Sequence, residues 1–435
     1  MKYSSTRHSS PDVSFFEALW HPKANDGGLY MPEFIPTIPQ AVLHNMAQMS
    51  LAEIAYVVFT AVLSDEFTSA EIKEIVERAY NFPAPMVRLD DRVSVVELFG
   101  GPTLAFKDFG ARITAEFLRL TSSRINRPIN VFISTTGNTG SAMANALAGS
   151  PGINVFVVFP RGTATRALES QFTTAGRNIH AVEVNGSIDA CYSLVENALT
   201  DAELNKHFVQ MSVNSGNIAR ILGQTVYYFY AVSRLLADSP AGSPVVVSLP
   251  SGNLGNLTAG ILARRMGLQI SRFIACENSN NYLTRALLND DFEPSPAIPT
   301  LAYAADKSVP TNLERILDLY GEDTDNLLRH ITPVTVNDAN IIEAINDCYE
   351  HYHYLLDPHS AMAYYGLEHH LRDDETGLIL ATAHPAKSLT AMSAITGRPI
   401  ELPLQLNRFM GRQDLRQRIK PIYSSLRHLI IDANK

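Results

Sequence analysis

Short runs of apolar and β-branched residues recur along the chain beyond residue 90, and they alternate with longer stretches of helical periodicity. The runs lie at residues 130–135, 154–159, 180–184, 245–250, 272–276 and 377–382. Strands that are apolar on both faces are typical of parallel sheets, because helices cover both sides of such sheets. The alternation therefore predicts an α/β fold with mostly parallel sheets.

The first 90 residues follow a different pattern, which predicts a mixed and mostly helical segment. Apolar positions recur at helical spacing in residues 51–63 and 69–82, and the second stretch opens with Ser69 and ends before Pro83. Prolines and glycines punctuate residues 27–39, which favours an extended conformation there.

Two breaks divide the rest of the chain. Residues 237–244 are rich in Pro, Gly and Ser, and we expect them to join two domains. Residues 291–312 are rich in proline and are expected to form a long irregular crossing. The predicted organisation is an N-terminal segment, a first α/β domain and a second α/β domain, at residues 1–95, 96–240 and 241–435.

Composition narrows the classes of function. The 435 residues are 46% hydrophobic and 18% charged, which is typical of a globular protein of two or three domains. A net charge of −9 without a basic patch argues against nucleic acid as a partner, and no apolar run is long enough to span a membrane. The three cysteines are far apart and the first residues lack the apolar core of a signal peptide. We therefore expect a cytoplasmic protein without a metal site, as a monomer or a small homo-oligomer.

One lysine stands in an unusual setting, the stretch GGPTLAFKDFG at residues 100–110. Lys107 is surrounded there by apolar and small residues. Partial desolvation makes the neutral form of a lysine easier to reach, and the neutral amine is the nucleophile. The alternative is a lysine whose aliphatic part lies along the surface while its ammonium group stays in water.

A glycine-containing loop follows the predicted strand at 245–250. Backbone N–H groups at the start of a helix, unhindered by side chains at glycine, can bind an anion such as phosphate. The loop lacks the GxxxxGK[ST] pattern of a nucleotide-binding loop. Taken alone, it is equally compatible with an ordinary turn that uses glycine for its backbone angles. Its residues are Ser251, Gly252, Asn253, Leu254, Gly255 and Asn256.

A second loop follows the predicted strand at 130–135, and it suits a carboxylate as well as a phosphate. It combines hydroxyls, an amide and glycines in Thr135, Thr136, Gly137, Asn138 and Thr139, without a GxGxxG dinucleotide pattern. A reactive lysine and two anion-binding turns together predict pyridoxal phosphate (PLP), bound to Lys107 as a Schiff base. The second loop would then hold the carboxylate of a small-molecule amino-acid substrate.

The longer motifs of the chain resemble one family nearly end to end, the threonine synthases of the long bacterial and fungal class. The resemblance is carried by DGGLYMPEFIP, ELFGGPTLAFKDFGAR, LPSGNLGN, NSGNIARILGQ, LLDPHSAMAYYGL and TAHPAKS. It implies the fold-type-II architecture of PLP enzymes, which is similar to the tryptophan synthase β subunit. In that architecture PLP lies in the cleft between two parallel-sheet domains.

The resemblance also implies roles for single residues. Lys107 carries the cofactor and shuttles protons, the 251–256 loop holds its phosphate, and Thr382 offers a hydroxyl to the pyridine nitrogen. Asn138 meets the ring hydroxyl. The residues implied for the substrate carboxylate are Thr135, Thr136, Gly137 and Thr139, and those for its phosphate are Arg161, Asn214, Ser215, Asn217 and Arg220. The implied reaction converts O-phospho-L-homoserine and water to L-threonine and phosphate.

The chain departs from the family pattern at several positions that bear on the substrate. Glycine replaces histidine at Gly100, an amide replaces a carboxylate at Asn138, and family residues are replaced at Thr163, Leu168 and Ser170. Lysine is the family residue at the first and last of these three. A related phospho-lyase or β-replacement enzyme is therefore the alternative function. A non-catalytic regulator that binds PLP or a metabolite is a further one, which the retention of Lys107, both loops and Thr382 disfavours.

Overall fold

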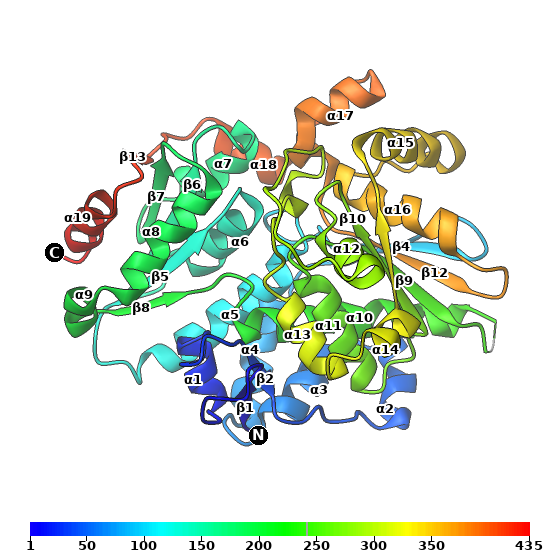
Figure 1. Ribbon diagram of the computed structural model, residues 1–435, viewed down its shortest axis with the longest axis horizontal. Helices are drawn as coiled ribbons and strands as arrows, with labels where there is room; N and C mark the ends of the chain where they lie inside the picture. Colours follow the sequence, from blue (N-terminus) through cyan, green and yellow to red (C-terminus); the bar gives the residue numbers. More distant parts are fainter. Residues whose placement is uncertain (241) are drawn as a thin grey trace.

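The computed structural model describes residues 1–240 and 242–435, and it is built around two separate sheets (Figure 1). The smaller of these two is five-stranded, with the strands in the order β13-β7-β6-β5-β8 and all neighbours parallel. Its strands are β5 (Ile129–Ser134), β6 (Ile153–Pro160), β7 (Ile179–Val184), β8 (Val209–Ser212) and β13 (Gln417–Ile419).

The larger sheet is six-stranded, with the order β11-β10-β9-β12-β4-β3. Its neighbours are parallel except for β3, which pairs antiparallel with β4 at the edge. The strands are β3 (Met86–Arg88), β4 (Val93–Glu97), β9 (Val245–Pro250), β10 (Arg272–Glu277), β11 (Ile331–Thr335) and β12 (Thr376–Ala381). The α/β fold with mostly parallel sheets is confirmed.

The N-terminal segment is mostly helical, as predicted, with one small antiparallel ribbon. The second predicted helix begins at Ser69, as predicted, and Thr68 caps it through a capping box with Glu71. The segment contains β1 (Tyr3–Ser5), α1 (Phe15–Trp20), β2 (Tyr30–Pro32), α2 (Gln40–Asn45), η1 (Met46–Gln48), α3 (Leu51–Leu63) and α4 (Ser69–Ala79).

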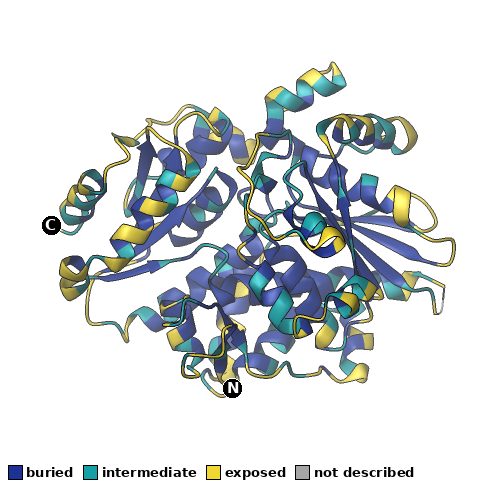
Figure 2. Cartoon of the chain, viewed as in Figure 1, coloured by how far each residue is buried: buried dark blue, intermediate teal, exposed yellow. Residues whose placement is uncertain are grey.

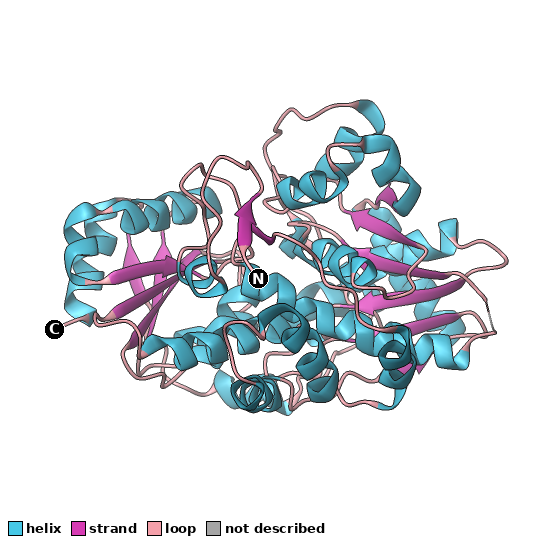
Figure 3. Cartoon of the chain, turned by 90° about the horizontal axis from the view of Figure 1, so that it is seen from below, coloured by secondary structure: helices cyan, strands magenta, loops and turns pink. Residues whose placement is uncertain are grey.

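Helices separate and cover the two sheets, which lie on opposite sides of a central helical layer (Figure 3). The helices between β4 and β9 in the sequence are α5 (Lys107–Ser122), α6 (Asn138–Leu147), α7 (Arg166–Thr173), α8 (Ile188–Thr200), α9 (Ala202–His207) and α10 (Ile218–Asp238). The later ones are α11 (Gly255–Arg265), α12 (Tyr282–Asn289), η2 (Tyr303–Ala305), α13 (Leu313–Tyr320), α14 (Thr324–His330), α15 (Asp338–Tyr352), α16 (Pro358–His370), η3 (Pro385–Ser388), α17 (Leu389–Thr396), α18 (Leu404–Met410) and α19 (Tyr423–Ala433).

The central strands contribute alternate residues to different cores. In β9, Val245 and Val247 face the central core with α5, α10 and α11, whereas Val246 faces the outer core with α15 and α16. The outer face of the five-stranded sheet packs against α8 and α19. Both sheets are therefore buried on both faces, which accounts for the continuous apolar runs in the sequence (Figure 2).

The sheets do not divide the chain into the contiguous ranges expected from the sequence. The strands β3 and β4 precede the first half but belong to the six-stranded sheet, and β13 returns from the C-terminus to pair with β7. Residues 239–244 connect α10 to β9, within the stretch expected to join two domains, and residue 241 lies outside the described residues. Residues 290–302 contain no helix or strand, which confirms the irregular crossing.

The described residues contain no helix suited to cross a membrane, no paired cysteines and no cluster suited to hold a metal ion. No helix in residues 1–240 and 242–435 is long and apolar enough to cross a membrane. The three cysteines are buried and unpaired. The same residues contain no group of three His, Cys, Asp or Glu side chains placed to hold a metal ion.

Candidate functional site

Lys107 and both glycine-containing loops meet in one cavity between the two sheets. The amine-bearing residue comes from the start of α5, Asn138 comes from the start of α6, and the 252–256 loop comes from the carboxyl end of β9. Carboxyl ends of parallel strands are where ligands bind in this class of fold. The other cavity residues include Phe106, Ser215, Gln224, Ala304, Ala305, His359, Thr382 and Ala383.

The side chain of Lys107 faces this cavity and has an unusually acidic ammonium group. Burial, with the positive charges of Arg220 and Lys307, lowers the pKa of Lys107 to about 7. Its Nζ lies 4.3 Å from the centre of the Phe106 ring. The neutral, nucleophilic amine is therefore the main form of Lys107 from slightly above neutral pH.

The loop after β9 is suited to a phosphate group. Among the described residues, none accepts a hydrogen bond from the backbone N–H groups of residues 252–257, and α11 begins within this stretch. A Cβ at Gly252 would lie 2.5 Å from Ala305 Cα, so only glycine fits there. The positive φ of the loop, +57°, belongs to Leu254 rather than to a glycine. Close approach, not backbone angle, explains Gly252.

The loop after β5 brings an unpaired amide to the cavity. The hydroxyl of Thr135 accepts hydrogen bonds from the N–H groups of Gly137 and Gly140, at 2.9 and 3.0 Å, so it braces the turn. The Oδ1 of Asn138 is buried without a partner in the described part of the chain. Such orphaned atoms are rare in a finished structure and fit a site that binds a polar ligand.

Thr382 follows β12 on the floor of the cavity and is held by its backbone. Its N–H donates to Ser360 Oγ at 3.0 Å, and its carbonyl accepts from the N–H of Phe106 at 2.8 Å. The residue next to Lys107 is thereby tied to the end of β12. Free N–H groups, a glycine cradle, an orphaned amide and a reactive amine together fit PLP.

Several other predicted residues lie outside this cavity. Asn214 and Asn217 line a second, larger cleft of about 1270 Å³, and Ser215 lines both this cleft and the first cavity. Neither space is lined by Thr135, Thr136, Gly137, Thr139, Arg161, Arg220 or Ser251. The Asn217 side chain caps α10 through the N–H of Ala219, at 3.1 Å, and so serves the fold.

The two arginines expected at the substrate phosphate are placed very differently. Arg161 is 68% exposed and lies 4.0 Å from Glu183 on the five-stranded sheet. Arg220 is buried and donates through Nη1 to the Val213 carbonyl at 2.9 Å, while its Nε is unpaired in the described structure. Burial lowers the pKa of Arg220 to about 10, so it remains a cation at neutral pH.

The departures from the family pattern have structural explanations at three positions. A Cβ at position 100 would lie 2.1 Å from the Pro83 carbonyl oxygen, so the local backbone requires Gly100. Leu168 packs over Gly137, whose Cβ would lie 2.3 Å from Leu168 Cδ2. Ser170 is buried and faces Met410 of α18 at 3.9 Å. Nothing in the structure explains the exposed Thr163.

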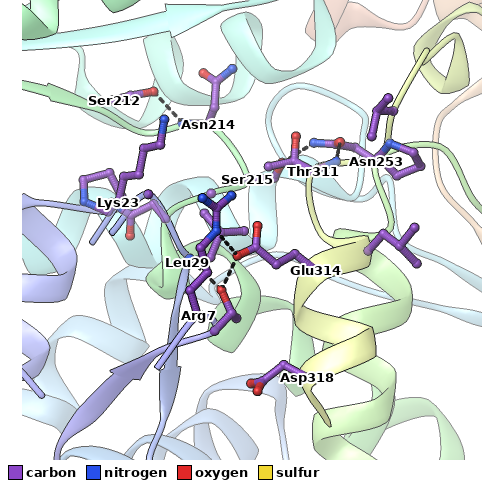
Figure 4. A pocket seen from close by; sticks show the side chains of 18 of the residues that line it. Arg7, Lys23, Leu29, Ser212, Asn214, Ser215, Asn253, Thr311, Glu314 and Asp318 are labelled. Carbon is purple, nitrogen blue, oxygen red and sulfur yellow. Dashed lines mark hydrogen bonds and ion pairs between the residues drawn. The ribbon is translucent and has the colours of Figure 1, made fainter. Parts of the chain in front are cut away.

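The larger cleft opens beside the cofactor-sized cavity and is lined from both halves and the N-terminal segment (Figure 4). Ser215 and Asn253 line both spaces, and Asn253 Nδ2 donates to Ser215 Oγ at 2.5 Å. On the opposite wall Arg7 pairs with Glu314 at 3.1 Å. A volume of this size admits a small amino acid next to the cavity.

Sequence reasoning missed several cavity residues. Ala304 and Ala305 lie in the irregular crossing, where no motif marks them, whereas Gln224 ends the motif NSGNIARILGQ and was assigned no role. His359 lies inside a motif, but its role was not assigned. Its Nδ1 donates to Asp357 at 2.7 Å and its Nε2 accepts from the N–H of Ala304 at 3.1 Å, which fixes the neutral tautomer.

Comparison with known proteins points to one family. A family model of pyridoxal-phosphate-dependent enzymes matches residues 82–382, and a model of the threonine synthase N terminus matches residues 2–80. The chain is 36% identical over 406 residues to threonine synthase of Serratia marcescens, covering 93% of each chain. It is 35% identical over 432 residues to that of Escherichia coli, covering 99% of this chain and 100% of that one.

Solved structures give the same result. The crystal structure of Escherichia coli threonine synthase superposes with a TM-score of 0.92 at 35% identity, covering 99% of this chain and 100% of that one. A PLP-bound threonine synthase from Brucella melitensis gives a TM-score of 0.94 at 29% identity, covering all of both chains. Maize serine racemase shares the fold at 18% identity, with a TM-score of 0.54 over 75% of this chain and 96% of that one.

Proposed function

Because this chain belongs to the threonine synthase family of PLP-dependent enzymes, we propose that it converts O-phospho-L-homoserine and water to L-threonine and phosphate. The observation that carries the proposal is the amine of Lys107, with a pKa of about 7, in the cavity that also contains the free N–H groups of residues 252–256. The reaction removes protons from two neighbouring carbons and expels phosphate, so it needs a base that works near neutral pH.

The cofactor, when bound, supplies an aldehyde for amino groups and a ring that withdraws electrons from the substrate. We assign its phosphate to the backbone N–H groups of residues 252–257, because they have no partner in the described structure. Asn138 is assigned to the ring hydroxyl and Thr382 to the ring nitrogen. A hydroxyl at that nitrogen leaves it largely unprotonated, so proton transfers by Lys107 carry more of the work.

Lys107 is then the group that moves protons at the substrate. Its Nζ, once free, takes the proton from Cα, releases it, and takes one from Cβ as phosphate leaves Cγ. A proton then returns to Cγ, the hydroxide of water adds at Cβ while its proton goes to the departed phosphate, and a proton returns to Cα. A pKa of about 7 suits both directions of transfer, because the amine can hold or give up a proton at little cost. We also propose that the second loop, residues 135–139, binds the substrate carboxylate.

The domain organisation, cellular location and assembly of the protein are part of the same proposal. The two sheet-based halves are the two domains between which the cofactor and a small-molecule substrate bind. A net charge of −9 and three buried, unpaired cysteines support a cytoplasmic enzyme without nucleic-acid partners. The assembly that we propose is a monomer or a small homo-oligomer.

Product analysis tests the proposal. The purified holoenzyme should be yellow, release phosphate from O-phosphohomoserine and form threonine, and borohydride should fix the cofactor on Lys107. The variant Lys107→Ala should not be labelled at this position. Phosphate release without threonine would replace the proposal with the related phospho-lyase. Bound cofactor without any turnover would favour the alternative function, a non-catalytic regulator that binds PLP.

A further inference from the structure

The segment from Tyr303 to Asn312 forms the wall between the cofactor cavity and the larger cleft. Ala304 and Ala305 line the cavity, whereas residues 309–311 line the cleft. The segment is fixed on both sides. The N–H of Ala304 donates to His359 Nε2 at 3.1 Å, and the N–H of Thr311 donates to Asn253 Oδ1 at 2.6 Å. Lys307 lies between these two anchors.

Lys307 reaches across from one half of the molecule to the other. Its Nζ donates to the hydroxyl of Tyr192 at 2.9 Å and lies 4.5 Å from the centre of the Tyr192 ring. Tyr192 belongs to α8, on the five-stranded sheet, and lines the larger cleft. Within the described residues no carboxylate lies within 4.0 Å of this ammonium group. A phenol satisfies one hydrogen bond but leaves the positive charge uncompensated.

The charges around Lys307 are unbalanced. Lys107 and Arg220 are two further basic groups in the same region, and Lys307 is one of the charges that lower the pKa of Lys107. The nearest acidic side chain in the sequence, Asp306, is occupied by Thr300 and Asn278 at 2.7 Å each. Several basic groups without a paired carboxylate form a site for an anion of high charge.

We propose that Lys307 binds the phosphate group of the substrate, with Tyr192 holding the ammonium group in place across the cleft until the phosphate arrives. This inference deepens the proposed function and rests on it. Lys307 itself lines neither space, but its ammonium group is held against Tyr192, which lines the larger cleft, whereas the expected Arg161 is exposed and faces Glu183. A phosphate dianion accepts charge-assisted hydrogen bonds from an ammonium group, whereas the uncharged hydroxyl of homoserine gains little from them.

The decisive variant is Lys307→Gln, which keeps a hydrogen-bonding group but removes the charge. Loss of one charge-assisted contact predicts a KM for O-phosphohomoserine raised about 10- to 100-fold. Lys307→Arg should recover most of the loss. The matched control is Lys23→Gln, because Lys23 lines the larger cleft, as Tyr192 does, but already faces Glu196 at 3.7 Å, and its KM should stay within about threefold of wild type.

Two measurements separate phosphate recognition from a merely structural role. L-homoserine, which lacks the phosphate, should perturb the cofactor absorbance of wild type and Lys307→Gln at equal concentrations. Inorganic phosphate should inhibit the wild type in competition with substrate. Its inhibition constant should be at least tenfold higher for Lys307→Gln. An unchanged KM and unchanged phosphate inhibition would overturn the proposal. Equal weakening for L-homoserine and for the phosphorylated substrate would overturn it too.

Calorimetry keeps this test separate from the proposed function. Inorganic phosphate is titrated into holoenzyme, in which the cofactor already fills the 252–257 loop. Binding by wild type that is lost in Lys307→Gln and retained in Lys23→Gln supports the phosphate site even if the wild type forms no threonine. Equal binding by wild type and Lys307→Gln overturns the phosphate site even if threonine is formed.

Discussion

Substitution by alanine should weaken PLP binding strongly at Gly252 and little at Gly255, and this difference tests how the loop after β9 holds phosphate. A Cβ at Gly252 would lie 2.5 Å from Ala305 Cα and 3.1 Å from the Ala305 carbonyl oxygen. Carbon atoms pack at about 3.5–4.0 Å, so the loop or the wall segment has to move by about 1 Å. At Gly255 the Cβ would meet Ile221 Cδ1 at 3.2 Å, and the end of that flexible side chain can turn away.

A shift of that size breaks hydrogen bonds from the loop to an anion. Each bond from an N–H group to a charged acceptor contributes about 1.5–3 kcal/mol. Loss of one such bond in Gly252→Ala predicts a Kd for PLP about 10- to 150-fold higher. Gly255→Ala should change the Kd by less than about threefold, because alanine is also the better helix former at the start of α11.

The assay is a titration of apoprotein with PLP, followed by absorbance, on both variants and wild type. Unfolding of each apoprotein provides the control, because overpacking at Gly252 should also lower its stability by about 1–3 kcal/mol. Equal PLP affinity in Gly252→Ala and Gly255→Ala would refute the reasoning. The loop would then be an ordinary turn, and the phosphate would bind elsewhere.

Three further outcomes are expected. The rate at which PLP attaches to apoprotein should rise with pH around a midpoint near 7, because the lowered pKa of Lys107 makes the neutral amine abundant above that pH; a midpoint near 10 would contradict the burial argument. Asn138→Asp should change the cofactor absorbance and weaken amino-acid binding, because it places a buried negative charge at the cavity; identical spectra and binding would place Asn138 outside the site. Arg161→Ala should leave the KM within about twofold, since Arg161 is exposed; a tenfold rise would mean that it contacts bound substrate.

The sequence predicted the strands that are continuous apolar runs and missed those that are not. All six runs are strands in the structure, and the one at 245–250 has the predicted bounds. The strand β4 was missed because Ser94 interrupts a short apolar run, and β11 because it contains Pro333, which usually argues against a strand. The edge strand β13 has no apolar pattern, because its residues are mostly exposed.

In the candidate site, too, the sequence predicted the residues that have a local signal and missed those that do not. Lys107 and the two loops carry local signals, since each stands at the start of a helix in a short, unusual stretch. Lys307 and Tyr192 carry none, because their contact depends on a crossing between the two halves, 115 residues apart in sequence. An ordinary turn that uses glycine for its backbone angles was one of two open interpretations of the β9 loop, but Leu254 supplies the positive φ. Residue types alone do not distinguish a glycine that is required because another segment packs closely against it from one that is required for its backbone angles.

The return of the C-terminus to the first sheet affects how the chain can be synthesised. Arg416, beside β13, bonds to Glu183 of β7 across 233 positions, and α19 completes the outer core against α8. Until residues 417–433 leave the ribosome, the edge of β7 stays open and the outer core around Val182 and Val184 lacks Leu426 and Ile430. An open edge of this kind invites pairing with other chains. The nascent protein is therefore most prone to aggregate when nearly all of its active-site residues have already been made.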